Sequence, residues 1–179
     1  MSKKKKINYS LIRFRPIKEE DTEFLYRVYA STREEELAIT DWSEQQKEEF
    51  LRMQFNLQHT QYLENYQGAS FDIILLDKVR IGRIYVHRMP KEIRLMDISL
   101  LAEYRSKGIG TKLLKDLIGE ADEKKHLLSF HVLQNNPALR LYERLGFKNA
   151  GEVGMHFLME RKPGSGKTTD QWHDEIDHI

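Results

Sequence analysis

The spacing of apolar residues changes at Ser70, and this change constrains the fold more than any other feature of the sequence. Before it, residues 21–29 and 43–62 carry apolar side chains at helical spacing, with Asp21 and the capping-box pattern at Ser43 as expected helix starts. A short extended segment at 11–16 precedes both. After Ser70, three apolar runs bounded by turns are typical of strands: 71–76, 80–86 and 93–101. A strand, two helices and a three-stranded antiparallel meander are therefore predicted.

The second half of the chain alternates helix and strand. An apolar stripe after Gly110 predicts a helix packed against the core; its members are Leu113, Leu114, Leu117, Ile118 and Ala121. A strand is expected at 127–133, a short helix at 137–145 that stops at Gly146, and a last strand at 155–159. Strand, helix and strand in succession predict a parallel pair in a mostly antiparallel sheet flanked by helices, so the expected fold class is mixed α/β (α+β).

Length and composition predict one domain. A chain of 179 residues with 40% hydrophobic residues can bury a single core. We expect this domain over 10–162, between a basic extension at 1–9 and a polar tail at 163–179. Because the sequence contains no cysteine, disulfides, thiolate metal sites and a cysteine nucleophile are excluded.

The charge balance argues against nucleic acid or a membrane as a partner. Lysine and arginine number 29 against 28 acidic residues, for a formal charge of +1. The run of four lysines at 3–6 is explained by a solvated terminus, with nucleic-acid binding as the alternative. No apolar segment behind it resembles a secretory signal, and no window approaches 18 apolar residues. We expect a cytoplasmic protein.

A glycine-containing turn joins the third strand of the meander to the following helix. The turn, Arg105-Ser106-Lys107-Gly108-Ile109-Gly110, would direct several free backbone N–H groups of the helix start at one place, which favours an anion. Glycine at Gly108 and Gly110 permits left-handed backbone and lets a diphosphate approach without meeting a Cβ atom. A plain tight turn is the alternative. The third glycine of a dinucleotide-binding fingerprint is missing.

Two segments resemble motifs of the GNAT N-acetyltransferase superfamily. Tyr104-Arg105-Ser106-Lys107-Gly108-Ile109-Gly110-Thr111-Lys112-Leu113-Leu114 is similar to that family's acetyl-CoA pyrophosphate motif. Asn135-Asn136-Pro137-Ala138-Leu139-Arg140-Leu141-Tyr142-Glu143-Arg144-Leu145-Gly146-Phe147 resembles its later motif, in which an asparagine precedes a helix that carries tyrosine and ends in Gly-Phe. With the matching order of strands and helices, the resemblance covers roughly 10–162 and implies a GNAT-like fold.

The resemblance implies a binding site for acetyl-CoA. It implies that the backbone of Leu100 and Leu101 pairs with the pantetheine arm and that the amides of 105–111 hold the pyrophosphate, contributed by Arg105, Ser106, Lys107, Gly108, Ile109, Gly110 and Thr111. It also implies an asparagine contact to the cofactor arm. The offset from the preceding strand favours Asn136, whereas counting back from Tyr142 favours Asn135; we prefer Asn136.

Acetyl transfer from a thioester to an amine needs a proton for the departing thiolate and a donor for the developing oxyanion. The family position of Tyr142 places it near the sulfur, and a phenol of pKa about 10 can protonate a thiolate of pKa about 8.5. A tyrosine that only packs its ring in the core is the alternative. For the oxyanion we expect a backbone N–H near Leu101, left unpaired where two strands diverge.

The base that takes the amine proton is less specified by the sequence. Asp97 lies on a largely apolar strand face and is a candidate, directly or through water; the alternative is a structural partner for a nearby arginine or backbone amide. Some family members carry a glutamate earlier on this strand, where this sequence has Arg94. Weaker substitutes are Glu92, Glu103 and His131.

Several other patterns resemble sites with functions other than acetyl transfer. The segment 164–169 imitates the end of a P-loop, but Arg161 stands where its first glycine belongs and no apolar helix follows. His173 and His178 share no helical face, so no metal site is expected. The main rival is a non-catalytic acetyl-CoA sensor or scaffold. The acceptor amine is not identified; a small amine and a protein amino group both remain open, as does a homodimer.

Overall fold

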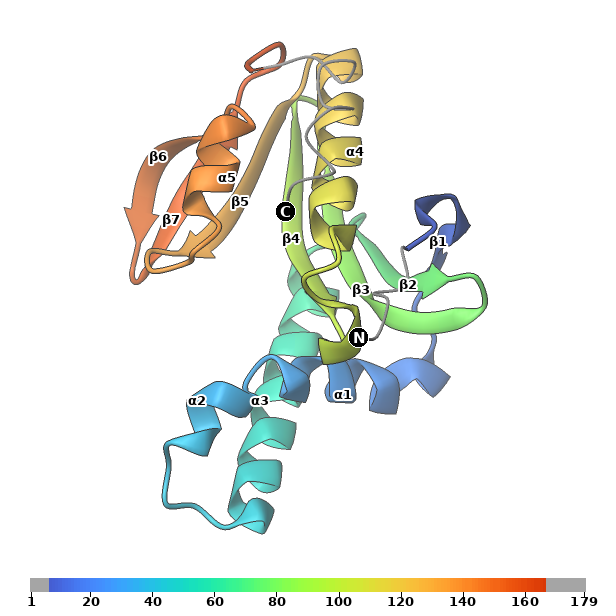
Figure 1. The fold of residues 1–179 in the computed structure, drawn as a ribbon, viewed down its shortest axis with the longest axis vertical. Helices are drawn as coiled ribbons and strands as arrows, with labels where there is room; N and C mark the ends of the chain where they lie inside the picture. Colours follow the sequence, from blue (N-terminus) through green and yellow to red (C-terminus); the bar gives the residue numbers. More distant parts are fainter. Residues whose placement is uncertain (1–6, 167–179) are drawn as a thin grey trace, which may run out of the picture. The chain divides into compact units, whose positions relative to one another are not determined.

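The structure is a computed structural model that describes residues 7–166 (Figure 1). Its first half contains β1 (Ile12–Pro16), α1 (Thr22–Ser31), α2 (Glu34–Ala38), α3 (Glu44–Asn65), β2 (Ser70–Leu76), β3 (Val79–Arg88) and β4 (Glu92–Leu100). Its second half contains α4 (Ile109–Lys124), β5 (Leu127–Leu133), α5 (Leu139–Arg144), β6 (Lys148–Val153) and β7 (His156–Arg161). Short 3₁₀ turns lie at Tyr9–Leu11, Glu19–Asp21 and Ala102–Tyr104.

The strands form one seven-stranded sheet in the order β1-β2-β3-β4-β5-β7-β6. β4 and β5 run parallel, with Ile93 opposite Leu128, and β1–β2, β5–β7 and β6–β7 are antiparallel. The mixed α/β class with one parallel pair at β4–β5 confirms the prediction. The chain divides into two compact units, residues 1–85 with 97–107 and residues 86–96 with 108–179.

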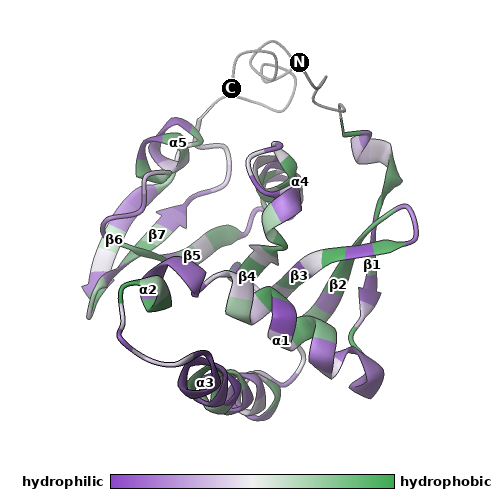
Figure 2. Ribbon diagram, turned by 60° about the horizontal axis from the view of Figure 1, so that its bottom comes forward, coloured by the Kyte–Doolittle hydropathy of each residue, from purple (hydrophilic) through white to green (hydrophobic). Residues whose placement is uncertain are grey.

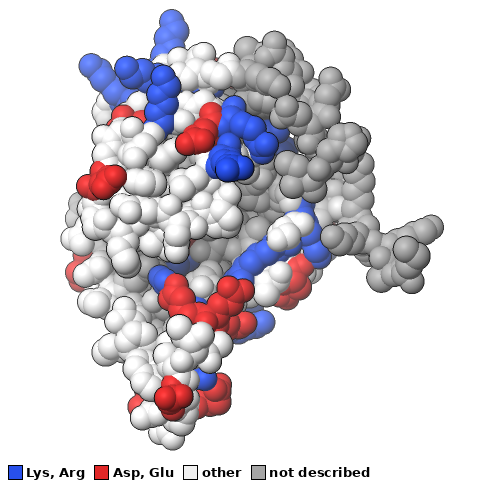
Figure 3. Space-filling model, turned by 60° about the vertical axis from the view of Figure 1, so that its left-hand side comes forward, with Lys and Arg blue, Asp and Glu red and all other residues white. Residues whose placement is uncertain are grey.

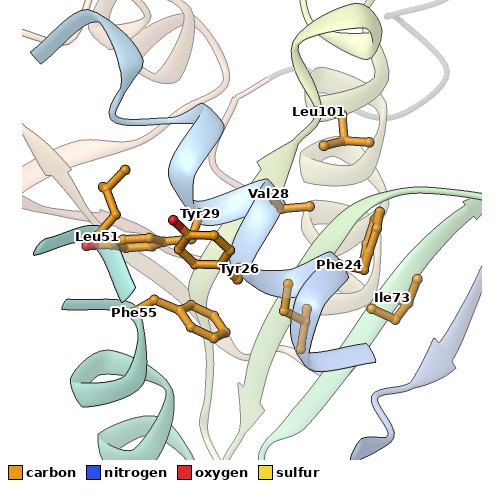
Figure 4. Close-up of a cluster of buried hydrophobic side chains, with 9 residues drawn as sticks. Phe24, Tyr26, Val28, Tyr29, Leu51, Phe55, Ile73 and Leu101 are labelled. Atoms are coloured by element: carbon orange, nitrogen blue, oxygen red, sulfur yellow. The ribbon is translucent and has the colours of Figure 1, made fainter. Parts of the chain in front are cut away.

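The core of the first unit lies between α1, α3 and the sheet (Figure 4). Its buried members are Phe24, Leu25, Tyr26, Val28, Tyr29, Leu51, Phe55, Ile73 and Leu101. Tyr26 and Tyr29 of α1 both pack against the ring of Phe55 of α3, with ring centroids 5.8 Å apart in each pair. Because Leu101 belongs to this cluster, the end of β4 is fixed by the same packing that holds α1.

Capping explains where the helices begin. The predicted capping box of α3 is present: Gln46 N donates to the Ser43 hydroxyl at 3.2 Å, and Ser43 N donates to Gln46 Oε1 at 2.9 Å. Asp21 precedes α1, but its carboxylate does not cap that helix. It is fully buried, accepts from Lys18 N at 2.9 Å and pairs with Arg15 and Arg80. Asp21 therefore stands at the predicted N-cap position of α1, but its carboxylate is used in the ion pairs and not for capping.

Two elements were not predicted. α2 has three glutamates in five residues and no buried side chain, and β6, which contains Lys148, Asn149 and Gly151, has no alternation of apolar and polar residues. Neither carries a periodic apolar signal, because α2 is exposed and β6 is an edge strand. α3 is largely hydrophilic along its length (Figure 2), and only Leu51 and Phe55 are buried in it.

Surface charges of both signs occur together, as the balanced composition indicates. Figure 3 shows basic and acidic side chains on the face that it draws. No helix within residues 7–166 combines the length and apolar character that a membrane crossing requires.

Candidate functional site

The end of β4 is held close to β3. A Cβ atom at Gly82 would lie 2.2 Å from the Ser99 carbonyl oxygen, so the strand glycine marks a close backbone approach, one of the two roles that a glycine inside a strand suggests. Beyond it, Leu101 N donates to Ile81 O at 2.9 Å. The expectation of an unpaired amide for the oxyanion is therefore wrong for Leu101, because this amide is bonded to β3.

The Arg105 side chain is used inside the first unit. Its Nε donates to Leu100 O at 2.8 Å and its Nη2 to the Ser31 hydroxyl at 2.7 Å. Its backbone N–H donates to Ala102 O at 3.2 Å. Arg105 thus joins the end of β4 to the end of α1, so its guanidinium and amide are both engaged within the protein.

The start of α4 has the geometry of an anion cradle. Gly108 is the N-cap residue at φ +73, has no side chain to cap the helix, and accepts the first intrahelical bond, from Lys112 N at 2.9 Å. The N–H groups of Ile109, Gly110 and Thr111 precede that bond and have no intrahelical acceptor. These first-turn amides, together with the positive end of the helix dipole, favour a negatively charged group.

Gly110 has no internal reason to be glycine. Its φ lies outside the left-handed region, and a Cβ atom built on it would meet no atom within 4 Å. In a helix interior, glycine costs roughly 0.5–1 kcal/mol relative to alanine. The open space beside the first-turn amides fits a group that approaches from outside, as a bound diphosphate would.

The remaining residues of the turn differ in their engagement. Ser106 takes the left-handed conformation at φ +54, and Lys107 O accepts from the Tyr9 hydroxyl at 2.8 Å. Both Ser106 and Lys107 are exposed, whereas the Lys112 ammonium is paired with Asp116. The Lys107 ammonium lies 5.7 Å from the centroid of the Tyr104 ring.

The two asparagines before α5 have different environments. Asn136 Oδ1 accepts from Ala138 N at 2.8 Å and its carbonyl from Leu139 N at 3.2 Å, so Asn136 shapes the turn that starts the helix. Asn135 is exposed, and within residues 7–166 its side chain has no recorded hydrogen bond. Of the two predicted contacts to the cofactor arm, the geometry leaves Asn135 available and commits the Asn136 oxygen to the turn.

We expect Asn135→Ala and Asn136→Ala to have opposite effects. Asn135→Ala should weaken coenzyme A binding by about 3–10-fold, the worth of one hydrogen bond, with an unchanged Tm. Asn136→Ala should cost about 1 kcal/mol of stability through the lost turn bond, with a smaller change in affinity. Calorimetric titration with coenzyme A and thermal denaturation measure both. The reverse pattern would identify Asn136 as the cofactor contact.

Tyr142 lies on α5 in an aromatic cluster of the second unit. Its ring meets Phe130 edge-on at 4.8 Å between centroids and Phe147 at 6.5 Å. Burial raises the pKa of the phenol above its ordinary value. Across the described part of the chain, no hydrogen bond to the Tyr142 hydroxyl is recorded. The ring is thus fixed by packing while its O–H is left for an external partner.

Asp97 is the ion-pair partner of a buried arginine. Its Oδ2 accepts from Arg83 Nε at 2.6 Å, its Oδ1 accepts from the Ser99 hydroxyl at 2.9 Å, and Arg83 is only 3% exposed. Arg83 Nη2 also donates to Gln58 Oε1 at 3.1 Å. This is the structural alternative that the sequence left open. A role as a base requires Asp97 to leave this pair.

The weaker base candidates also have partners or exposure that limit them. Glu92 Oε1 accepts from Arg94 and, at 2.6 Å, from the Ser129 hydroxyl, and Glu103 is exposed. The pKa of His131 is lowered by burial and by Arg94, so its imidazole is neutral at pH 7 and can accept a proton.

Sequence reasoning missed the surroundings of the Arg83–Asp97 pair. Tyr85 lies under the guanidinium, 5.1 Å from its carbon to the ring centroid, and Tyr62 of α3 packs edge-on against Tyr85 at 5.5 Å. Burial raises the pKa of both phenols to about 12. Only the alternation of Arg83 and Tyr85 on β3 could have indicated this polar cluster, because α3 joins it through tertiary packing.

Three features of the sequence lie partly or wholly outside the described residues: the lysine run, the P-loop-like segment and the C-terminal histidines. The lysines at 3–6, Lys167 to Thr169 of the P-loop-like segment, His173 and His178 are not described by the structure. In the part that is described, no three His, Cys, Asp or Glu side chains gather in a way that could hold a metal ion.

Comparisons with known proteins identify the family and support the fold. The model of the acetyltransferase (GNAT) family matches residues 23–147. An N-alpha-acetyltransferase of Saccharolobus solfataricus is 31% identical over 104 residues, 49% of this chain and 61% of the relative, so the chain matches less than two thirds of that protein's length.

Solved structures with the same fold include proteins bound to coenzyme A. The PaiA N-acetyltransferase of Thermoplasma acidophilum in complex with coenzyme A superposes with a TM-score of 0.62 at 25% identity, over 84% of this chain and 98% of that one. A GNAT acetyltransferase of Elizabethkingia anophelis with acetyl-CoA bound gives 0.53 at 18% identity, over 85% and 98%, and supports the fold alone.

Proposed function

The chain belongs to the acetyltransferase (GNAT) family, and from this premise we propose that it is an acetyl-CoA-dependent N-acetyltransferase that moves acetyl directly to a primary amine in a ternary complex. The observation that carries the proposal is the start of α4, where Gly108 leaves the first-turn amides without acceptors and Gly110 leaves the space beside them open. A diphosphate fits both features.

Different residues of the proposed site bind different parts of acetyl-CoA. The amides of Ser106, Lys107, Gly108, Ile109, Gly110 and Thr111 hold the pyrophosphate. The pantetheine arm lies along the end of β4 at Leu100 and Leu101, without pairing to Leu101, whose N–H and C=O are bonded to Ile81 and Tyr104. Asn135 contacts that arm, and Arg105 acts indirectly by fixing Leu100. Bound acetyl-CoA supplies the activated acetyl group.

Tyr142 is the proposed proton donor. Transfer forms a C–N bond and breaks the C–S bond, so the departing sulfur needs a proton and the amine loses one. The Tyr142 hydroxyl is unengaged within the described residues, and its raised pKa keeps it protonated at neutral pH. For the amine proton, Asp97 is the proposed base in competition with its ion-pair role; the neutral imidazole of His131 is the substitute.

Tyr142→Phe should lower kcat by about 100-fold, the usual lower bound for a general acid, while the Kd for acetyl-CoA stays within about twofold. The protonated phenol is the active form. Because the pKa of Tyr142 is raised, kcat should hold up to about pH 10 and fall only above it, and the variant should lack this alkaline limb. Steady-state kinetics across pH measure both. Unchanged turnover would remove the proton-donor role.

A thermal-shift titration tests the donor substrate. Acetyl-CoA at about 100 times its Kd should stabilise the protein by about 2.7 kcal/mol. Absence of a shift would overturn the proposal. A shift without turnover on any amine would favour the second candidate, a non-catalytic acetyl-CoA sensor or scaffold, against which the free Tyr142 hydroxyl argues.

Activity assays with a panel of amines test which acceptor the protein uses. The N-alpha-acetyltransferase relative makes a peptide with a free N-terminus the first candidate, and the exposed glutamates of α2 suit a cationic acceptor. An N-terminally blocked lysine peptide, a polyamine and an aminoglycoside complete the panel, read out as released thiol. A homodimer and a cytoplasmic location stay predictions from the sequence.

A further inference from the structure

One buried guanidinium in the second unit joins the C-terminal ends of α4 and α5 to β7. Arg161 of β7 is 1% exposed, and its Nε donates to Leu145 O, the C-cap residue of α5, at 2.9 Å. Its Nη1 and Nη2 donate to the two oxygens of Asp122, in the last turn of α4, at 2.7 and 3.1 Å. We call Arg161, Asp122 and the Leu145 carbonyl the Arg161 clamp.

The clamp stabilises α5, which is too short to be stable on its own. α5 has six residues, far below the length at which an isolated helix is stable in water. It ends in a Schellman turn, in which Gly146 N donates to Glu143 O and Phe147 N donates to Tyr142 O, each at 3.0 Å. This turn leaves the Leu145 carbonyl for Arg161, whose positive charge also suits a helix C-terminus.

The end of α5 is enclosed and has little freedom to shift. Gly146 is left-handed at φ +92, and a Cβ atom on it would lie 2.6 Å from Ser165 O and 3.3 Å from Arg161 Nε. The chain after β7 is itself tied to the clamp, because Gly164 N donates to Asp122 Oδ1 at 2.7 Å. The C-terminal end of α5 is therefore packed closely against the clamp and the segment that follows β7.

The clamp connects the two halves of the second unit's site. Asp122 lies on the helix whose first turn forms the anion cradle, and Leu145 lies three residues after Tyr142. We propose that Arg161 and Asp122 are positioning residues that set the place of the Tyr142 hydroxyl relative to the cofactor held at the start of α4. This inference rests on the proposed role of Tyr142 as proton donor.

The test is a double-mutant cycle between Arg161→Lys and Tyr142→Phe. Lysine keeps the charge but cannot bond the Leu145 carbonyl and both Asp122 oxygens in the same planar geometry. A misplaced proton donor should lower kcat by about 10-fold while the KM for acetyl-CoA stays within about twofold. In the Tyr142→Phe background, Arg161→Lys should have no further effect on kcat, because it acts through Tyr142.

Matched variants separate positioning from general loss of structure. Arg88→Lys alters an exposed pair with Glu120 on the same helix and should leave kcat unchanged. An equal loss of kcat from Arg161→Lys in both backgrounds, or a rise in KM in place of the fall in kcat, would overturn the clamp alone. Unchanged kcat in Tyr142→Phe would overturn the proton donor and the clamp together. If Arg161→Lys does not fold, Asp122→Asn enters the same cycle under the same criteria.

Discussion

Asp97→Asn is expected to lower the free energy of unfolding by about 3–5 kcal/mol, because it leaves the charge of Arg83 buried without its carboxylate. Arg83 is 3% exposed, and its Nε lies 2.6 Å from Asp97 Oδ2. The amide of asparagine and the neutral Gln58 cannot balance that charge. Denaturant unfolding measures the loss, which corresponds to a fall in Tm of roughly 10 °C.

A double variant decides between the two roles of Asp97. Asp97→Asn with Arg83→Met removes both charges, so no buried guanidinium is left without a carboxylate, and stability should largely return. Recovery of stability together with kcat would leave Asp97 as a structural partner. Recovery of stability with kcat still lost would establish Asp97 as the base. Glu48→Gln, in an exposed pair with Arg52, is the control and should change stability by less than about 0.5 kcal/mol.

The sequence was sufficient where local pattern decides structure. α4 and α3 are long enough for their apolar residues or capping box to mark them, and the parallel pair β4–β5 follows from strand, helix and strand in succession. α2 and β6 escaped because short exposed elements need no apolar period. β6 forms because it pairs with β7, and the sequence of β6 alone does not indicate that pairing.

In the candidate site, too, the residues in continuous motifs could be predicted and the contacts made by tertiary packing could not. The turn at 105–110 and Tyr142 could be found because each motif is continuous in the sequence. The pairs Arg83–Asp97 and Arg161–Asp122 join residues 14 and 39 positions apart, and the bond from Leu101 N to Ile81 O depends on how two strands meet. Such contacts follow from tertiary packing. The sequence alone therefore could not show whether the carboxylate of Asp97 is a catalytic base or the ion-pair partner of an arginine.

Gly110→Asp should separate cofactor binding from folding. Aspartate in the first turn of a helix is stabilised by the helix dipole by about 0.3–1 kcal/mol, and a Cβ atom at this position meets nothing within 4 Å. We therefore expect a Tm equal to or above that of the unchanged protein. A carboxylate about 4 Å from a phosphate charge costs about 4 kcal/mol near a protein surface, so the Kd for coenzyme A should rise about 1,000-fold.

Gly110→Asn has nearly the same shape without the charge and shows how much of that loss is steric. If a diphosphate lies against the first-turn amides, Gly110→Asn should bind coenzyme A more tightly than Gly110→Asp, and the difference should shrink as salt screens the charges. Pantetheine, which lacks the diphosphate of coenzyme A, should bind both variants with the same affinity. Unchanged coenzyme A affinity in Gly110→Asp would place the phosphates elsewhere, and the open space beside Gly110 would then need another occupant.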